Sequence, residues 1–204
     1  MARGSLRGCV AAALVAVSCG TRAAPGPVPQ NGDLVFERSS SRQSAAIQWA
    51  TASRWSHVGI VEVGPGGDVA VLEALGKVSR TPWAAWRKRA RRGGGVLVLR
   101  PFGPSAAQRE AAVEEARRML GRPYDPRFEW DDEKIYCSEL VVKAYERGAG
   151  VSYGRRQKLG DLRLAGVEAA AEKRFGGPIP KDLVLVTPAS LVEDTRLARI
   201  YEGP

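Results

Sequence analysis

Two short β-rich segments separated by a glycine-rich turn constrain the fold of this 204-residue chain most strongly. Residues 56–63 and 69–75 are rich in Val, Ile and Leu, and the five residues between them read Gly-Pro-Gly-Gly-Asp. Gly and Asp favour the tight backbone geometry that joins neighbouring antiparallel strands. The two segments are therefore predicted to form an antiparallel hairpin, which places an antiparallel sheet in the fold.

Hydrophobic periodicity places further strands and helices along the chain. Strands are predicted at residues 32–36, 96–100 and 197–201, and helices at 41–51, 106–120, 137–147 and 167–174, with Gly148 closing the third helix. A chain of this length fits one domain with a sizeable core. The mixture of strands and helices predicts an α+β fold in which the antiparallel sheet packs against helices.

The first 31 residues read as a targeting segment and a linker. Arg3 and Arg7 precede an apolar run that is too short to cross a hydrocarbon core of about 30 Å, as is typical of a secretory signal. Residues 1–23 are predicted to be this signal, 24–31 a Pro/Gly linker, and 32–204 the folded domain. The mature protein is therefore expected in the cell envelope.

Two cleavage sites remain open for this signal. Ala16-Val17-Ser18-Cys19 resembles a bacterial lipobox, which favours a lipoprotein whose Cys19 is lipidated and which associates with the membrane through that anchor. The alternative is an ordinary signal-peptidase site near residues 21–23. Incorporation of radiolabelled palmitate would separate the two.

The counts of histidine and cysteine limit the chemistry of the chain. His57 is its one histidine, so a site that needs two imidazoles from this chain is excluded. If processing removes Cys9 and removes or lipidates Cys19, Cys137 becomes a lone thiol in an oxidising compartment. Such a residue is either a small buried hydrophobe or a nucleophile.

A nucleophilic site can be assembled around this thiol. Cys137 is predicted to begin a helix, whose dipole favours the thiolate, and a thiolate that attacks a carbonyl needs an imidazole, for which His57 is available. The hairpin places Glu73, late in its second strand, beside His57, at the start of its first. Glu62 lies five residues after His57 and points to the opposite face, so strand parity favours Glu73 as the group that orients the imidazole.

The basic run at residues 87–92 follows Trp83 and Trp86 and allows two interpretations. On a helix, the bases and the two indoles would suit anionic lipid headgroups or an acidic cell-wall polymer. The alternative, which the three-residue spacing of the Trp pair favours, is a solvated face with the indoles in the core. No nucleic-acid partner is expected, because export removes it.

Five segments, in order, resemble the permuted papain-like amidases of the YiiX/YaeF type in the NlpC/P60 superfamily. They read Gly-Asp-Leu-Val-Phe at 32–36, Trp-Ser-His-Val-Gly-Ile at 55–60, Leu-Glu-Ala at 72–74, Gly-Arg-Pro-Tyr-Asp at 121–125 and Tyr-Cys-Ser-Glu-Leu-Val at 136–141. The resemblance implies a circularly permuted papain-like (NlpC/P60) fold, because His precedes Cys here.

The resemblance also assigns roles to four residues. It implies that Cys137 is the nucleophile, that His57 is the general base and acid, and that Glu73 orients the imidazole. Tyr124 matches a tyrosine that lines the oxyanion side of such sites, although a residue between Pro123 and Asp125-Pro126 could instead pin a turn.

The sequence therefore predicts an exported cysteine hydrolase that cleaves an amide bond through an acyl-thioester on Cys137. The expected substrate is a peptidoglycan peptide or an N-acyl or lipid-linked amide. No metal or organic cofactor is expected, because one imidazole and one thiol do not make a soft zinc site and no glycine-rich phosphate loop follows a strand. A thiol acyltransferase of the same fold and a non-catalytic cell-envelope binding module are the alternatives.

Overall fold

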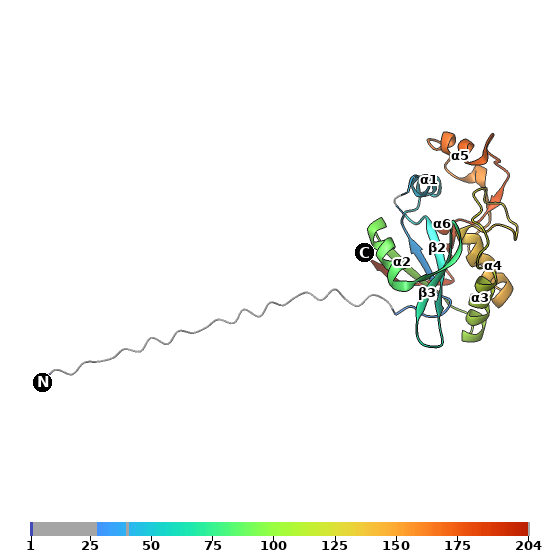
Figure 1. Cartoon of the computed structure of the whole chain (residues 1–204). Helices are drawn as coiled ribbons and strands as arrows, with labels where there is room; N and C mark the ends of the chain where they lie inside the picture. The colour runs from blue at the N-terminus through green and yellow to red at the C-terminus, as the bar shows by residue number, and fades with distance from the viewer. Residues whose placement is uncertain (2–27, 40, 204) are drawn as a thin grey trace.

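A six-stranded antiparallel sheet forms the centre of the protein (Figure 1). The computed structural model describes Met1 and residues 28–39 and 41–203. The strands run in the order β4-β3-β2-β1-β5-β8. Their bounds are β1 Leu34–Glu37, β2 His57–Val63, β3 Val69–Leu75, β4 Lys77–Pro82, β5 Val96–Pro101 and β8 Leu197–Gly203. The predicted hairpin is confirmed as the antiparallel pair of β2 and β3.

Six α-helices and a small second sheet surround the central sheet among the described residues. The helices are α1 Arg42–Thr51, α2 Trp83–Gly93, α3 Ala106–Arg118, α4 Cys137–Ala149, α5 Glu168–Phe175 and α6 Pro188–Val192. The second sheet pairs β6 Gln157–Lys158 with β7 Val184–Leu185, and the short 3-10 helix η1 Leu159–Asp161 follows β6. The structure therefore confirms the α+β class, with an antiparallel sheet packed against helices.

The two faces of the central sheet pack against different helices, because alternate side chains of a strand point to opposite faces. On one face, residues such as Phe36 and Ile60 join the core formed with α3 and α4. On the other face, Val35 and Val61 pack with Trp86 and Ala90 of α2. The apolar side chains of β2 and β3 therefore pack against different helices according to the face on which they lie.

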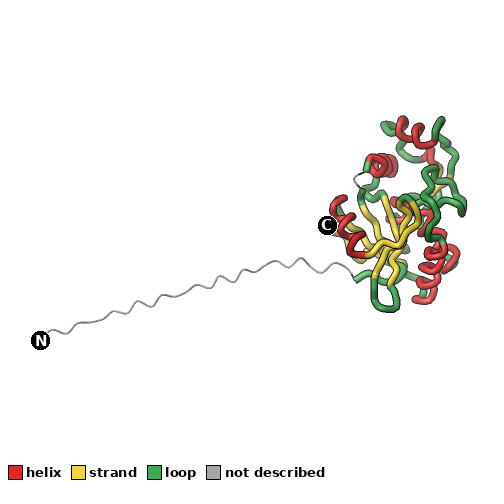
Figure 2. The backbone as a smooth tube through the Cα atoms, in the orientation of Figure 1, coloured by secondary structure: helices red, strands yellow, loops and turns green. Residues whose placement is uncertain are grey.

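A third part of the molecule lies beyond one end of the sheet (Figures 1 and 2). There α1 and α5 lie near each other, together with the irregular chain that carries η1 and the second sheet. Ser41 begins α1, since its hydroxyl accepts a hydrogen bond from the Ser44 N–H at 3.1 Å. This part provides much of the wall of the pocket described below.

The structure corrects two details of the expected elements. β4 was not expected, since Lys77–Pro82 alternates half-exposed and exposed side chains around one buried valine and has the weak hydrophobic pattern of an edge strand. Gly148 does not close the third predicted helix, which continues to Ala149 and is capped by Gly150. Gly148 instead allows α4 to approach α3, because a Cβ there would lie 2.4 Å from the backbone of Ala111.

The N-terminal expectations lie largely outside the described residues. The predicted signal at 1–23 and its Cys19 fall there, as does the first part of the linker. The last linker residue, Asn31, accepts a hydrogen bond from the Val63 N–H at 2.9 Å. Among the described residues, none of the helices has the length and apolar character needed to cross a membrane.

Candidate active site

Cys137 lies at the N-terminus of α4, as predicted. The Glu139 carboxylate accepts a hydrogen bond from the Tyr136 N–H at 3.1 Å and pairs with the Lys143 ammonium at 2.7 Å, which fixes the first turn. The Cys137 side chain is buried with only a small exposed fraction and still lines a pocket. N–H groups in the first turn of a helix have no carbonyl partner within the helix, so they are available to a bound group.

His57 connects Cys137 with Glu73. Its Nε2 lies 2.7 Å from Oε2 of Glu73, and its side chain also forms a hydrogen bond with Cys137. Because Nε2 is engaged with Glu73, the ring nitrogen on the Cys137 side is Nδ1. The three side chains predicted to act together are therefore brought into one chain of hydrogen bonds.

The strand register explains how His57 reaches Glu73. Glu73 lies opposite Gly59, so His57 is its diagonal neighbour, two residues away on the same face. Gly59 presents no side chain between them, and a Cβ at this position would lie 2.4 Å from Cγ1 of Val71. The predicted contact is confirmed, with a diagonal register rather than a directly opposed pair.

Burial and hydrogen bonding shift the pKa values of the histidine and the glutamate in opposite directions. Burial alone would lower the pKa of His57, but the hydrogen bonds and charges of Cys137 and Glu73 outweigh it and raise this pKa to about 10. Burial alone would raise the pKa of Glu73, but His57 and Arg89 outweigh it and lower this pKa to about 2. At neutral pH these shifts favour an imidazolium next to a carboxylate.

Glu62, the rival carboxylate, points to the opposite face of the sheet. Its Oε1 lies 2.5 Å from Nε of Arg117 on α3, and its Oε2 bonds Arg80 on β4. These bonds lower its pKa against the effect of burial. The prediction from strand parity is confirmed, since Glu62 is paired away from His57.

Three groups around Glu73 were not predicted from the sequence. Thr81 donates a hydrogen bond to Oε1 of Glu73 at 2.6 Å. Arg89 donates to both Glu73 oxygens, at 3.0 and 2.6 Å, and also to the buried Glu37.

Arg89 belongs to the basic run at 87–92, so the interpretation of that run as a solvated face is wrong at this residue. Trp86 is in the core, as predicted.

Tyr124 lies beside Cys137 in the wall of the same pocket. Its hydroxyl accepts a hydrogen bond from Nε2 of Gln43 at 3.2 Å. Burial, together with the nearby Cys137, raises the pKa of this hydroxyl, so it keeps its proton and remains a donor. Its backbone also bonds Gly76, so Tyr124 holds a turn as well as facing the site.

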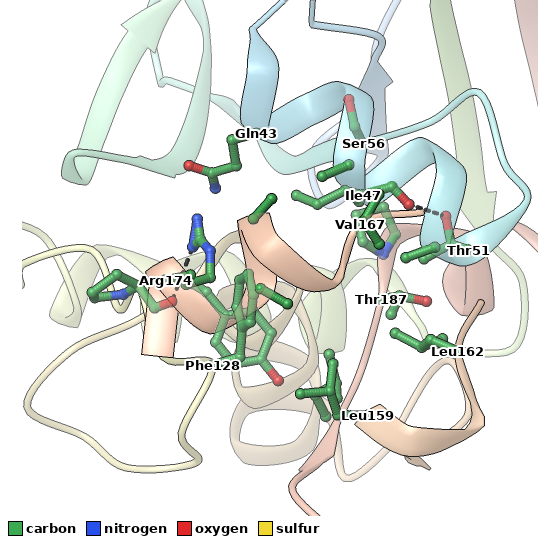
Figure 3. A pocket seen from close by; sticks show the side chains of 18 of the residues that line it. Gln43, Ile47, Thr51, Ser56, Phe128, Leu159, Leu162, Val167, Arg174 and Thr187 are labelled. Carbon is green, nitrogen blue, oxygen red and sulfur yellow. Dashed lines mark hydrogen bonds between the residues drawn. The ribbon is translucent and has the colours of Figure 1, made fainter. Parts of the chain in front are cut away.

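The pocket has a volume of about 640 Å³ and is mainly apolar (Figure 3). Such a volume accommodates a small molecule or an extended chain. Much of the apolar lining comes from α1, α5 and the segments around η1 and β7: Ala46, Ile47, Ala50, Leu159, Leu162, Leu164, Val167, Ala170, Ala171 and Leu185. Arg42, Lys173 and Arg174 supply basic groups to it. Sequence periodicity did not reveal this pocket.

An antiparallel sheet that presents a histidine to a cysteine at a helix N-terminus, with the histidine earlier in the chain, defines a permuted papain-like site. The comparison with protein families agrees: residues 28–201 match the family described as "Permuted papain-like amidase enzyme, YaeF/YiiX, C92 family". The chain belongs to this family.

Two proteins illustrate the similarity. The chain is 36% identical over 174 residues to the uncharacterized protein YiiX of Escherichia coli K12, a match that covers 84% of this chain and 86% of the relative. A crystal structure described as metalloprotein yiiX from Escherichia coli O157:H7 superposes with a TM-score of 0.81 at 36% identity. That superposition covers 86% of this chain and 98% of the other, which confirms the permuted papain-like fold.

The description of that second structure raises the question of a metal. Within residues 28–39 and 41–203, no group of three or more His, Cys, Asp or Glu side chains is arranged to hold a metal ion. The side chains present there therefore do not fit a metal site.

Proposed function

We propose that this chain is an amidase of the Cys-His-Glu type that forms an acyl-thioester on Cys137. Membership of the amidase family supports a cysteine hydrolase. The observation that carries the finer assignment is the hydrogen-bonded series Cys137–His57–Glu73 at the edge of an apolar pocket. A thiolate, an imidazolium and an orienting carboxylate are the groups that this chemistry needs.

The proposed reaction proceeds in two steps. The Cys137 sulfur attacks the amide carbonyl carbon, and as the C–N bond breaks, the His57 imidazolium gives its proton to the leaving amine. His57 then takes a proton from water, whose oxygen attacks the thioester, and the C–S bond breaks to release a carboxylic acid. The Tyr124 hydroxyl and the first-turn N–H groups of α4 are the proposed donors to the oxyanion.

The substrate that the pocket favours is an N-acyl or lipid-linked amide. The pocket lining is mostly apolar. Burial of an acyl chain against such a lining stabilises the complex by about 0.8 kcal/mol for each methylene removed from water. A peptidoglycan stem peptide would place charged groups against the same lining. Export to the cell envelope, with an anchor at Cys19 when the lipobox is used, is part of the same proposal.

Product analysis tests this proposal. The protein is incubated with N-acyl amides of increasing chain length and, separately, with cell-wall peptides, and the products are identified by mass spectrometry. We expect free fatty acid and amine, with kcat/KM rising with chain length. An acylated alcohol or amine in place of acid would identify an acyltransferase, and binding without product would identify a binding module.

A substitution in the pocket wall should separate long from short substrates. Ile47 is half-buried and lines the pocket from α1, so Ile47→Asp is expected to lower kcat/KM for long-chain amides by about tenfold or more and to leave acetyl amides little changed. Ala45→Asp is the matched control, because Ala45 is exposed on the same helix and does not line the pocket. Equal losses for long and short chains would contradict an acyl-binding role.

A further inference from the structure

Arg89 contacts two buried carboxylates with different parts of its guanidinium group. Its Nε lies 3.0 and 3.1 Å from the two oxygens of Glu37, and its terminal nitrogens lie 3.0 and 2.6 Å from the two oxygens of Glu73. Both carboxylates are almost fully buried, whereas about a third of the Arg89 side chain is exposed. One guanidinium group therefore binds and orients both carboxylates.

Glu37 is a second acid within reach of the imidazole. In the β1–β2 register it lies directly opposite His57, and strand parity places it on the same face as His57 and Glu73. Burial raises the pKa of Glu37, although His57 and Arg89 act in the opposite direction. The fold thus presents two carboxylates to one imidazole, and the structure shows a hydrogen bond to His57 only from Glu73.

We propose that Arg89 is a positioning residue that gives each of these two carboxylates its place. Its Nε holds Glu37, while its terminal nitrogens hold Glu73 against His57. This inference rests on the proposed function, since it concerns how the Cys137–His57 pair is maintained. The role falls to a residue of α2, because α2 covers the face of the sheet that carries His57, Glu37 and Glu73.

The charges around Glu73 explain what the loss of Arg89 would do. The groups that face Glu73 are His57 from β2, Thr81 from β4, Arg89 from α2 and, through its charge, Glu37 from β1. Without the guanidinium, two buried carboxylates near a thiolate are matched by one imidazolium. Like charges at such distances favour one proton held by the pair of carboxylates, which lowers the negative charge that Glu73 presents to the imidazolium.

Alkylation of Cys137 by iodoacetamide, resolved from other cysteines by peptide mass spectrometry, tests this role without a substrate. We expect Arg89→Gln to lower the rate at pH 6.5 by about tenfold, with a loss that grows as the pH falls, because one carboxylate then retains a proton. Arg89→Gln/Glu37→Gln should recover part of the rate, because the second mutation removes the competing carboxylate. Lys88→Gln, the same charge change at an exposed position of α2, is the control.

Two results would overturn the proposal. One is a folded Arg89→Gln protein with the wild-type rate and pH profile; the other is a double variant that shows no recovery. If Arg89→Gln does not fold, Arg89→Lys provides the test, because lysine keeps the positive charge and lacks the planar set of donors. We expect its alkylation rate to be about threefold lower than that of the wild type. A wild-type rate would reject the role. Since alkylation needs no amide, an inactive wild-type enzyme would count against the proposed function alone.

Discussion

Replacement of Cys137 by serine is expected to abolish amide hydrolysis, with kcat lowered by at least about a thousandfold. A thiol beside an imidazole gives up its proton far more readily than an alcohol does. The side chain is buried but small, and serine is close to it in size. The melting temperature should therefore change little, and kcat is to be measured on protein shown to be folded.

His57→Ala should have an effect of similar size, because the thiolate and the imidazolium act as one unit. For the same reason the double variant Cys137→Ser/His57→Ala should lose no more activity than either single variant. Turnover that survives in Cys137→Ser would assign the reaction to another residue. Fully additive losses would show that the two residues act separately.

The second large effect is expected at Glu73. Glu73→Gln keeps a hydrogen-bonding group beside His57 and removes the charge that stabilises the imidazolium. We expect kcat to fall by roughly tenfold to a thousandfold, with KM little changed. Steady-state kinetics on a chosen amide give both values.

Glu62→Gln is the matched control for this substitution. Glu62 is equally a buried carboxylate of the hairpin, but it pairs with Arg117 and Arg80 on the other face. Its loss should lower stability modestly and leave kcat within about twofold. If Glu62→Gln is the more damaging change to kcat, the assignment of the third member of the site is wrong.

The parts of the site predicted from the sequence are those that depend on local patterns. The glycine-rich turn fixes the pairing of β2 and β3, and strand parity then separates Glu73 from Glu62. The polar loop before Cys137 and the apolar run after it mark the start of a helix. The hairpin and the helix lie far apart in the chain, since 80 positions separate His57 from Cys137. The five motifs of the family predict that they come together.

The parts that were missed depend on how distant elements pack. Arg89 is one of five bases in the run at 87–92, and no local feature distinguishes it from its neighbours until α2 is placed on the sheet. Glu37 becomes a neighbour of His57 only through the β1–β2 register. Most of the pocket wall comes from α1 and from residues 159–188, segments that are joined only in the folded protein.

The ionisation of His57 tests the central claim most directly, and the chain has a single histidine, so selective isotope labelling of histidine gives the NMR signals of one imidazole. The folded wild-type protein, prepared without a histidine tag, is titrated alongside the Cys137→Ala variant. Our account predicts that the ring stays protonated far above its ordinary pKa of 6.5 and loses its proton as the pH rises towards about 10. In Cys137→Ala this pKa should fall, because the thiol partner is absent. A wild-type ring that titrates near pH 6.5, unchanged by Cys137→Ala, would contradict the thiolate–imidazolium pair.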